Sequence, residues 1–149
     1  MKSRPRSCER EVAKHLTELL SQFGISKFER IPILGRTGPD ITVNESKLVI
    51  DVKSRLEVPK GVFGPLYETE RYIAVPLDNL LDLASREPAW SNFSSVLVDR
   101  WFDHMDEWTR ENCRDGITCL VLHRPKKPIG KAQVVINKTD RRRLCQIMR

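Results

Sequence analysis

The sequence predicts an α/β fold, a single domain spanning the whole chain of 149 residues, with a helix, three strands, a helix and two strands in that order. Two segments, 8–24 and 92–112, carry apolar residues at helical spacing. Short apolar runs flank the turn-forming segment 44–47, a pattern typical of a β-hairpin. The apolar runs 117–123 and 132–136 predict the two later strands.

The first helix is predicted over 8–24, because Gly24 is a good stop signal after an apolar stripe. Glu9 extends this inward stripe by one turn. A buried acid needs a partner, and a metal ion or Lys53 would serve. The alternative is a first-turn glutamate that the helix dipole favours.

The hairpin predicts a specific register. With Glu45 and Ser46 at the tip, residue 41 pairs with 50 and Asp40 faces Asp51. Such cross-strand Cβ atoms are about 4.5–5.5 Å apart, and like charges at that distance destabilise a sheet. A divalent cation between the two carboxylates would remove the repulsion. Lys53 lies two residues beyond Asp51, so its side chain is expected on the same face.

Two acids and a lysine at one point predict metal-assisted hydrolysis of a phosphodiester. A metal ion polarises the phosphate and lowers the pKa of a bound water. A neighbouring lysine orients or deprotonates that water, or neutralises charge developing on the phosphate.

These residues resemble the motif of the PD-(D/E)xK nuclease superfamily. Pro39 and Asp40 match its "PD", and Asp51 and Lys53 match its "(D/E)xK". A Glu-Arg pair beginning at Glu9, before a short helix, is similar to archaeal and phage Holliday-junction resolvases. The resemblance covers roughly residues 8 to 55 and resumes weakly over the predicted strand 117–123.

The resemblance implies a restriction-endonuclease-like core, a mixed sheet flanked by helices. It implies an Mg²⁺- or Mn²⁺-dependent DNA endonuclease selective for branched DNA. Asp40, Asp51, the Val52 carbonyl and Glu9 would hold the metal, and Lys53 would act on the nucleophile. A homodimer or higher homo-oligomer is expected, since two coordinated nicks need two sites.

Basic residues concentrate at the two ends of the chain, although the net charge is only +6. The C-terminal segment 124–149 has nine Lys or Arg and one acid. Basic ends beside a nuclease-like core favour DNA contact over a merely solubilising surface. Arg36 and Arg55 are predicted phosphate clamps. The other predicted nucleic-acid contacts are Arg124, Lys126, Lys127, Arg141, Arg142 and Arg143.

The remaining segments are predicted more coarsely. Segment 28–34 is expected to be the first strand. Segment 56–92, rich in Pro and Gly, is expected to be an irregular insertion or specificity segment with a short helix at 77–85. A basic helix is expected at 139–148. The Trp-rich stripe of segment 92–112 indicates core or an interface rather than a base-stacking platform.

Several other polar residues receive weaker roles. His123 is expected to be a surface histidine, with phosphate contact or catalysis as the alternative. His15 and His104 lack matching ligand spacing, so neither is given a metal role. Asp99 and Asp103 are expected on a solvated helix face, with an outer shell of the site as the alternative.

The composition limits the classes of protein. No apolar run approaches the length of a membrane span, and the basic N-terminus lacks the apolar core of a secretory signal. Four widely spaced cysteines predict reduced thiols rather than a zinc site or disulfides. The expected location is cytoplasmic, as a nucleoid-associated protein or a product of a phage or mobile element.

Two alternatives to junction cleavage stay open. A sequence-specific homing or restriction endonuclease would use segment 56–92 to read sequence. A module that keeps the fold but only binds nucleic acid is the alternative outside the enzymes.

Overall fold

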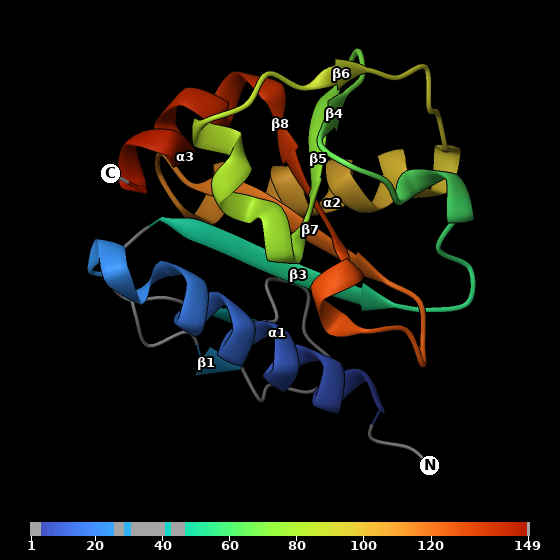
Figure 1. Cartoon of the computed structure of the whole chain (residues 1–149), viewed down its shortest axis with the longest axis horizontal. Helices are drawn as coiled ribbons and strands as arrows, with labels where there is room; N and C mark the ends of the chain where they lie inside the picture. Colours follow the sequence, from blue (N-terminus) through green and yellow to red (C-terminus); the bar gives the residue numbers. More distant parts are fainter. Residues whose placement is uncertain (1–3, 26–28, 31–40, 43–46, 149) are drawn as a thin grey trace.

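The strands form one mixed sheet with helices on both faces (Figure 1), in a computed structural model that describes residues 4–25, 29–30, 41–42 and 47–148. Within these residues the strand order is β1-β2-β3-β7-β8-β5-β4-β6. The predicted α/β class, with a mixed sheet flanked by helices, is therefore confirmed.

The first helix, α1, spans Arg4–Leu20 and continues as the 3-10 turn η1, Ser21–Phe23. It begins earlier than the predicted Cys8, and Pro5 in its first turn suits a helix start. Gly24 ends it in the left-handed conformation, with φ 78° and its N–H donating to the Ser21 carbonyl. The buried stripe consists of Cys8, Val12, Ala13, Leu16 and Leu20.

Three short strands pair antiparallel in chain order: β1 (Glu29–Arg30), β2 (Ile41–Thr42) and β3 (Leu48–Ser54). Strands β2 and β3 form the predicted hairpin. Ile41 pairs with Ile50, as the sequence predicts. The predicted pairing of Asp40 with Asp51 lies outside the described residues.

Strand β3 pairs in parallel with β7, Ile117–His123. Helix α2, Val96–Asn112, makes the crossover behind the sheet (Figure 1). It begins later than the predicted residue 92, because Ser95 caps it by accepting a hydrogen bond from the Val98 N–H.

The segment 56–92 forms regular structure, whereas the sequence suggested an irregular course. It contains η2 (Lys60–Val62), β4 (Tyr67–Glu68), β5 (Tyr72–Pro76), η3 (Leu77–Ala84) and β6 (Ala89–Trp90). Strand β5 pairs antiparallel with β8 and so belongs to the main sheet. The physical reason is the apolar run from Tyr72 to Val75, which is fully buried as a strand. The predicted short helix exists as the 3-10 helix η3.

The last part of the chain supplies an inner strand. After η4, Ile129–Lys131, strand β8 spans Gln133–Asn137 and pairs with both β7 and β5. The 3-10 turn η5, Lys138–Asp140, leads into helix α3, Arg141–Ile147. The basic C-terminal segment is therefore part of the folded core rather than an appended tail.

Two apolar clusters fill the two faces of the sheet. Helices α1 and α3 and the 3-10 helix η3 cover one face, where they pack against Ile50 and Val52 of β3. Helix α2 and residues around η2 cover the other face, where they pack against Leu120 and Leu122 of β7. Among the described residues, none of the helices is long and apolar enough to cross a membrane.

Candidate active site

Asp51 and Lys53 lie side by side on β3. Asp51 is buried, with 5% of its surface exposed, and Lys53 Nζ is 3.5 Å from Asp51 Oδ2. Asp51 pairs with Leu120 and Lys53 with Leu122, so both charged side chains project toward the α2 face of the sheet. The structure thus brings together two of the predicted catalytic residues on one face of the sheet, as their spacing predicts.

Arg55 comes directly after β3 and lies on the same side of the sheet as Asp51 and Lys53. Its Cζ lies 5.7 Å from the centre of the Trp101 ring of α2, within the range of a cation–π contact. Arg55 remains exposed, so its guanidinium is held by the aromatic ring and still open to solvent. Asp51, Lys53 and Arg55 therefore form a row that we call the β3 polar row.

Two predicted site residues, Asp40 and Arg36, lie outside the described residues. Of the metal ligands that the resemblance implies, the described part of the chain contains Glu9, Asp51 and Val52. Within this part, no group of three or more His, Cys, Asp or Glu side chains is arranged to hold a metal ion.

Glu9 lies on helix α1 and not on the strand that carries Asp51 and Lys53. It is half-buried on α1, which packs on the Val52 face of β3, opposite the face that carries Asp51. Its neighbour Cys8 has its Sγ 3.5 Å from His123 Nδ1, at the C-terminal end of β7. Glu9 therefore lies toward the same end of the sheet as Lys53, on the helix of the opposite face.

His123 is buried, with 6% of its surface exposed, and the prediction of a surface histidine is wrong. Its Nε2 donates to the Lys127 carbonyl at 2.7 Å, which leaves Nδ1 to accept from the Ser54 hydroxyl at 2.7 Å. The register of β3 and β7, which pairs Ser54 with His123, explains the burial. This network fixes the loop after β7 to the end of β3.

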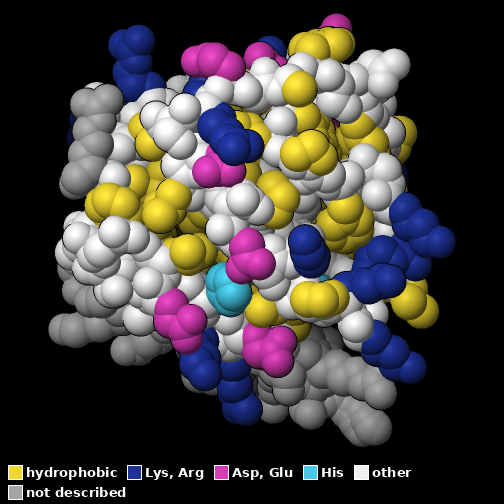
Figure 2. Space-filling model, viewed as in Figure 1, with side chains coloured by type: hydrophobic (Ala, Val, Ile, Leu, Met, Phe, Trp, Pro, Cys, Tyr) yellow, Lys and Arg dark blue, Asp and Glu magenta, His cyan; other side chains and the backbone are white. Residues whose placement is uncertain are grey.

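The predicted DNA-contacting cations divide into two groups. Three have partners inside the protein: Arg124 donates to two carbonyls of the β3–η2 loop, Arg141 to carbonyls near the end of η3, and Arg143 to Asp140 and two carbonyls before β7. Lys126, Lys127 and Arg142 are exposed. In Figure 2, which has the same view as Figure 1, Lys and Arg gather toward the right-hand edge, over the connections that follow β3 and β7.

Asp99, Asp103 and His15 have local partners. Asp99 and Asp103 both pair with Arg71 of the β4–β5 turn, with Arg71 Nη1 3.3 Å from Asp99 Oδ1. His15 Nε2 lies 2.6 Å from Asp78 Oδ1, an ion pair when the histidine is protonated. These contacts hold elements together and lie outside the β3 polar row.

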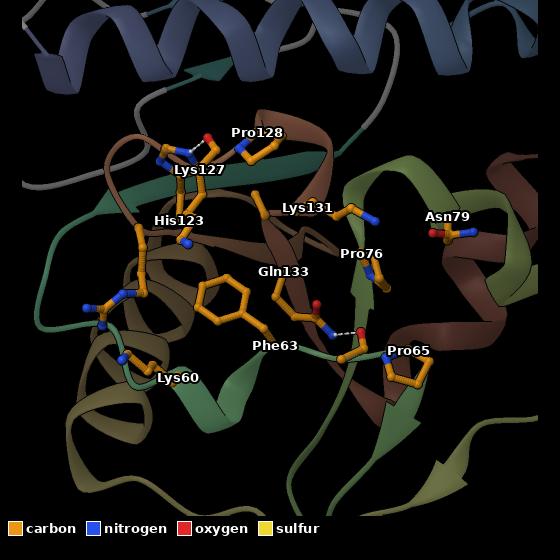
Figure 3. A pocket seen from close by; sticks show the side chains of 13 residues that line it. Lys60, Phe63, Pro65, Pro76, Asn79, His123, Lys127, Pro128, Lys131 and Gln133 are labelled. Atoms are coloured by element: carbon orange, nitrogen blue, oxygen red, sulfur yellow. Dashed lines mark hydrogen bonds between the residues drawn. The ribbon is translucent and has the colours of Figure 1, made fainter.

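A cavity of about 660 Å³ opens next to the C-terminal end of β7, and the sequence did not indicate it. His123, Phe63 and Gln133 are among the residues that line it (Figure 3). Gln133 was the available signal: it is a polar residue directly before the apolar residues 134–136 of β8. No protein-family model, curated protein or solved structure matches the chain.

Proposed function

We propose that this chain is a divalent-metal-dependent endonuclease that hydrolyses phosphodiester bonds in DNA. The β3 polar row is the observation that carries the proposal. A buried carboxylate 3.5 Å from a lysine ammonium, in a strand of the hairpin, matches the acid and lysine that this chemistry requires.

The topology supports the proposal. Helix α1, three antiparallel strands, helix α2 and a strand parallel to β3 follow one another, with β4 to β6 inserted before α2. With β4 to β6 set aside, this order is the one expected of the restriction-endonuclease-like core that the resemblance to the PD-(D/E)xK superfamily implies, and it supports the proposal.

The assigned roles follow from the chemistry of the side chains. Asp40, Asp51 and the Val52 carbonyl supply hard oxygen ligands suited to Mg²⁺ or Mn²⁺, with Glu9 completing the set. The bound ion would polarise the phosphate and acidify a water molecule. Lys53 orients the attacking water and offsets negative charge on the phosphate. Glu9 would reach the ion from α1, which lies on the opposite face of the sheet from Asp51, so Glu9→Gln tests its role separately.

The DNA would lie across the exposed cations near the β3 polar row. Arg55, Lys126 and Lys127 follow β3 and β7 at the same end of the sheet. Arg142 is exposed on α3, and the three arginines with internal partners contribute less. Such contacts give salt-dependent binding through counterion release.

The test is cleavage of a four-way junction, a linear duplex of mixed sequence and a single strand, each in Mg²⁺ and in Mn²⁺. We expect junction-selective nicking by the wild-type chain. Asp51→Asn and Lys53→Met should each lower the rate by about 100-fold or more, the size of effect seen when one preorganised catalytic group is removed. Glu9→Gln should do the same if Glu9 is a ligand.

Asp115→Asn is the matched control. Asp115 is exposed just before β7, and its φ of 61° suits asparagine, so cleavage should be unchanged. Cleavage of linear duplex at a fixed site would move the assignment to a sequence-specific endonuclease. DNA binding without cleavage of any substrate would contradict the enzyme and leave a binding module.

Metal binding has an independent readout. An ion that binds only the folded state stabilises it, by about 2.7 kcal/mol at a concentration 100 times Kd. We expect Mg²⁺ or Mn²⁺ to raise the Tm of the wild-type chain but not that of Asp51→Asn. Equal shifts in both proteins would place the ion elsewhere.

A homodimer is the proposed assembly. Helix α2 buries Val98, Phe102 and Met105 within the protein, whereas Trp101 and Trp108 remain partly exposed and are available for an interface. Light scattering should show a dimer that Trp108→Glu dissociates. A monomeric wild-type chain that still cleaves junctions would contradict this arrangement.

A further inference from the structure

The cavity beside the β3 polar row combines three features in one place. It lies where β3, β5 and β7, which run parallel to one another, reach their C-terminal ends and where β8 begins. Ligands of open α/β sheets bind at the carboxyl ends of strands. Its volume of about 660 Å³ is suited to a small organic molecule.

The first feature is a buried amide aimed into the cavity. Gln133 is fully buried, and its Nε2 donates to the Gly64 carbonyl at 3.1 Å. Its Oε1 has no hydrogen-bond partner among the described residues. Figure 3 shows this oxygen on the side of Gln133 that faces Lys131 and Pro76. Because an unsatisfied buried acceptor is unfavourable, the position favours a ligand that brings an N–H donor.

The second feature is a flat apolar wall. Phe63 is half-buried and faces the cavity, and Pro65 and Pro76 line the opposite side (Figure 3). A planar heterocycle can stack on the phenyl ring and have its edge directed toward Gln133 Oε1. Base stacking on aromatic side chains is a main source of affinity for unpaired nucleotides.

The third feature is a cationic rim. Lys60, Lys127 and Lys131 line the cavity and are exposed, and no acidic side chain is among the described residues that line it. The loop with Lys127 is anchored, because the Lys127 carbonyl accepts from the buried His123. The rim therefore offers preplaced positive charge to a phosphate group.

We propose that this cavity binds one unpaired nucleotide, with the base stacked on Phe63. An N–H of the base donates to Gln133 Oε1, and the phosphate lies on the lysine rim. Every common base carries an N–H group, so the site distinguishes a base from no base rather than one base from another. The inference rests on the proposed function in taking the nucleotide from a DNA strand that the β3 polar row cleaves. A free nucleoside monophosphate has the same chemistry.

The position of the cavity connects it with the cleavage chemistry. Ser54 follows Lys53 in β3 and donates to His123, which lines the cavity. A strand whose phosphate lies at Lys53 can therefore place a neighbouring unpaired base in the cavity. Bulges, flaps and junction centres supply such bases, whereas a paired duplex does not.

The experiment measures binding without cleavage. In EDTA, Asp51→Asn protein is titrated by fluorescence anisotropy into three fluorescein-labelled duplexes of equal length. One is fully paired, one carries a single-nucleotide bulge, and one carries an abasic residue at the bulge. We expect the bulged duplex to bind about 10-fold more tightly than the other two, a ratio in the range for one stacked base.

Variants locate the effect in the cavity. In the same background, Phe63→Leu and Gln133→Met should each abolish the preference for the bulge and leave affinity for the paired duplex unchanged. Phe93→Leu is the control, because Phe93 packs against the same apolar cluster but does not line this cavity. Thermal unfolding verifies that each variant is folded. Should a cavity variant not fold, Lys60→Gln, at an exposed position, provides a second test, because it should lower the salt dependence of bulge binding and leave that of paired-duplex binding unchanged.

A competition with dAMP identifies the source of the nucleotide. Displacement of the bulged duplex only at millimolar dAMP supports a nucleotide within a strand. Saturable dAMP binding at micromolar concentration that Phe63→Leu abolishes, without a preference for the bulge, supports a free nucleotide. The nucleotide site is overturned if neither ligand binds in a manner that depends on Phe63 or Gln133. Because no arm requires catalysis, this failure differs from failure of the nuclease, which would leave the binding preference intact.

Discussion

At the scale of single residues, burial decides which charged and ionisable groups can react. Tyr67 and Tyr72 are the only two tyrosines of the sequence, and both are buried. Burial raises the pKa of Tyr72 to about 12, and the nearby Asp99 carboxylate adds to the increase. Burial also raises the pKa of Tyr67, with Tyr72 contributing.

These pKa values predict a loss of stability in alkali. In the unfolded chain both phenols ionise near pH 10. Because the folded pKa values are higher, the stabilising contribution is complete below about pH 10 and is lost as the pH rises through the folded pKa values. At pH 10, absorbance at 295 nm should show almost no phenolate in the native protein. In denaturant at the same pH, about half of the phenol groups should be ionised. Native ionisation near pH 10 would contradict the burial of both rings.

Arg124 and Arg142 should behave differently on substitution, although both were predicted to contact DNA. Arg124 Nη1 donates to the Leu56 and Val58 carbonyls at 2.8 and 2.6 Å. Arg124→Ala leaves two carbonyls without this donor, and we expect a loss of about 2 kcal/mol in the free energy of unfolding. Arg142→Ala removes an exposed side chain and should change stability by less than about 0.5 kcal/mol.

Urea unfolding checks this pair. Filter binding to DNA completes the comparison, since Arg142→Ala should weaken binding and reduce its salt dependence. Equal stability of the two variants would mean that the Arg124 hydrogen bonds make no net contribution to the free energy of unfolding.

At the scale of elements, local patterns determined most of what could be predicted. Strand β7 has the predicted bounds, because seven consecutive buried residues leave little choice of structure. The pairing of Ile41 with Ile50 followed from the position of the turn. Helix α2 was predicted too long, since Ser95 caps it after a stretch whose apolar Phe93 fits the helical spacing.

The elements that were missed depend on partners distant in sequence. Strand β5 is a strand because β8, about sixty residues later in the chain, supplies its hydrogen bonds. Two-residue strands such as β4 and β6 carry no periodic signal of their own. His123 and Gln133 belong to the same class, because their burial follows from strand pairing and not from their neighbours in sequence.

The cap of α2 gives a prediction at this scale. Ser95 Oγ accepts from the Val98 N–H at 3.2 Å, and Ser95→Ala leaves that donor without its cap. We expect the free energy of unfolding to fall by about 1 kcal/mol. Ser94→Ala, at the exposed neighbouring position, should have little effect. Similar Tm values for the two alanine variants would show that the Ser95 capping hydrogen bond adds no net stability.

At the scale of the whole molecule, β8 joins the two halves of the sheet. On one side it pairs with β7, which continues to β3 and the β3 polar row. On the other side it pairs with β5, which belongs to the segment 56–92. Ile136 of β8 is fully buried among residues of α1, η3 and α3. A strand with partners on both edges and a filled face is expected to couple everything that it contacts.

Cooperative unfolding of the whole sheet is the consequence. Removing buried methyl groups by Ile136→Ala should lower the free energy of unfolding by about 3 kcal/mol. In native-state hydrogen exchange, the amides of β3 and of β5 should lose the same amount of protection, because both reach β8 through backbone hydrogen bonds. Val96→Ala, at a position that is 74% exposed, should leave both strands unchanged. If β5 alone loses protection while β3 keeps it, segment 56–92 unfolds separately, and its strands are an addition to the nuclease-like core rather than part of one cooperative unit.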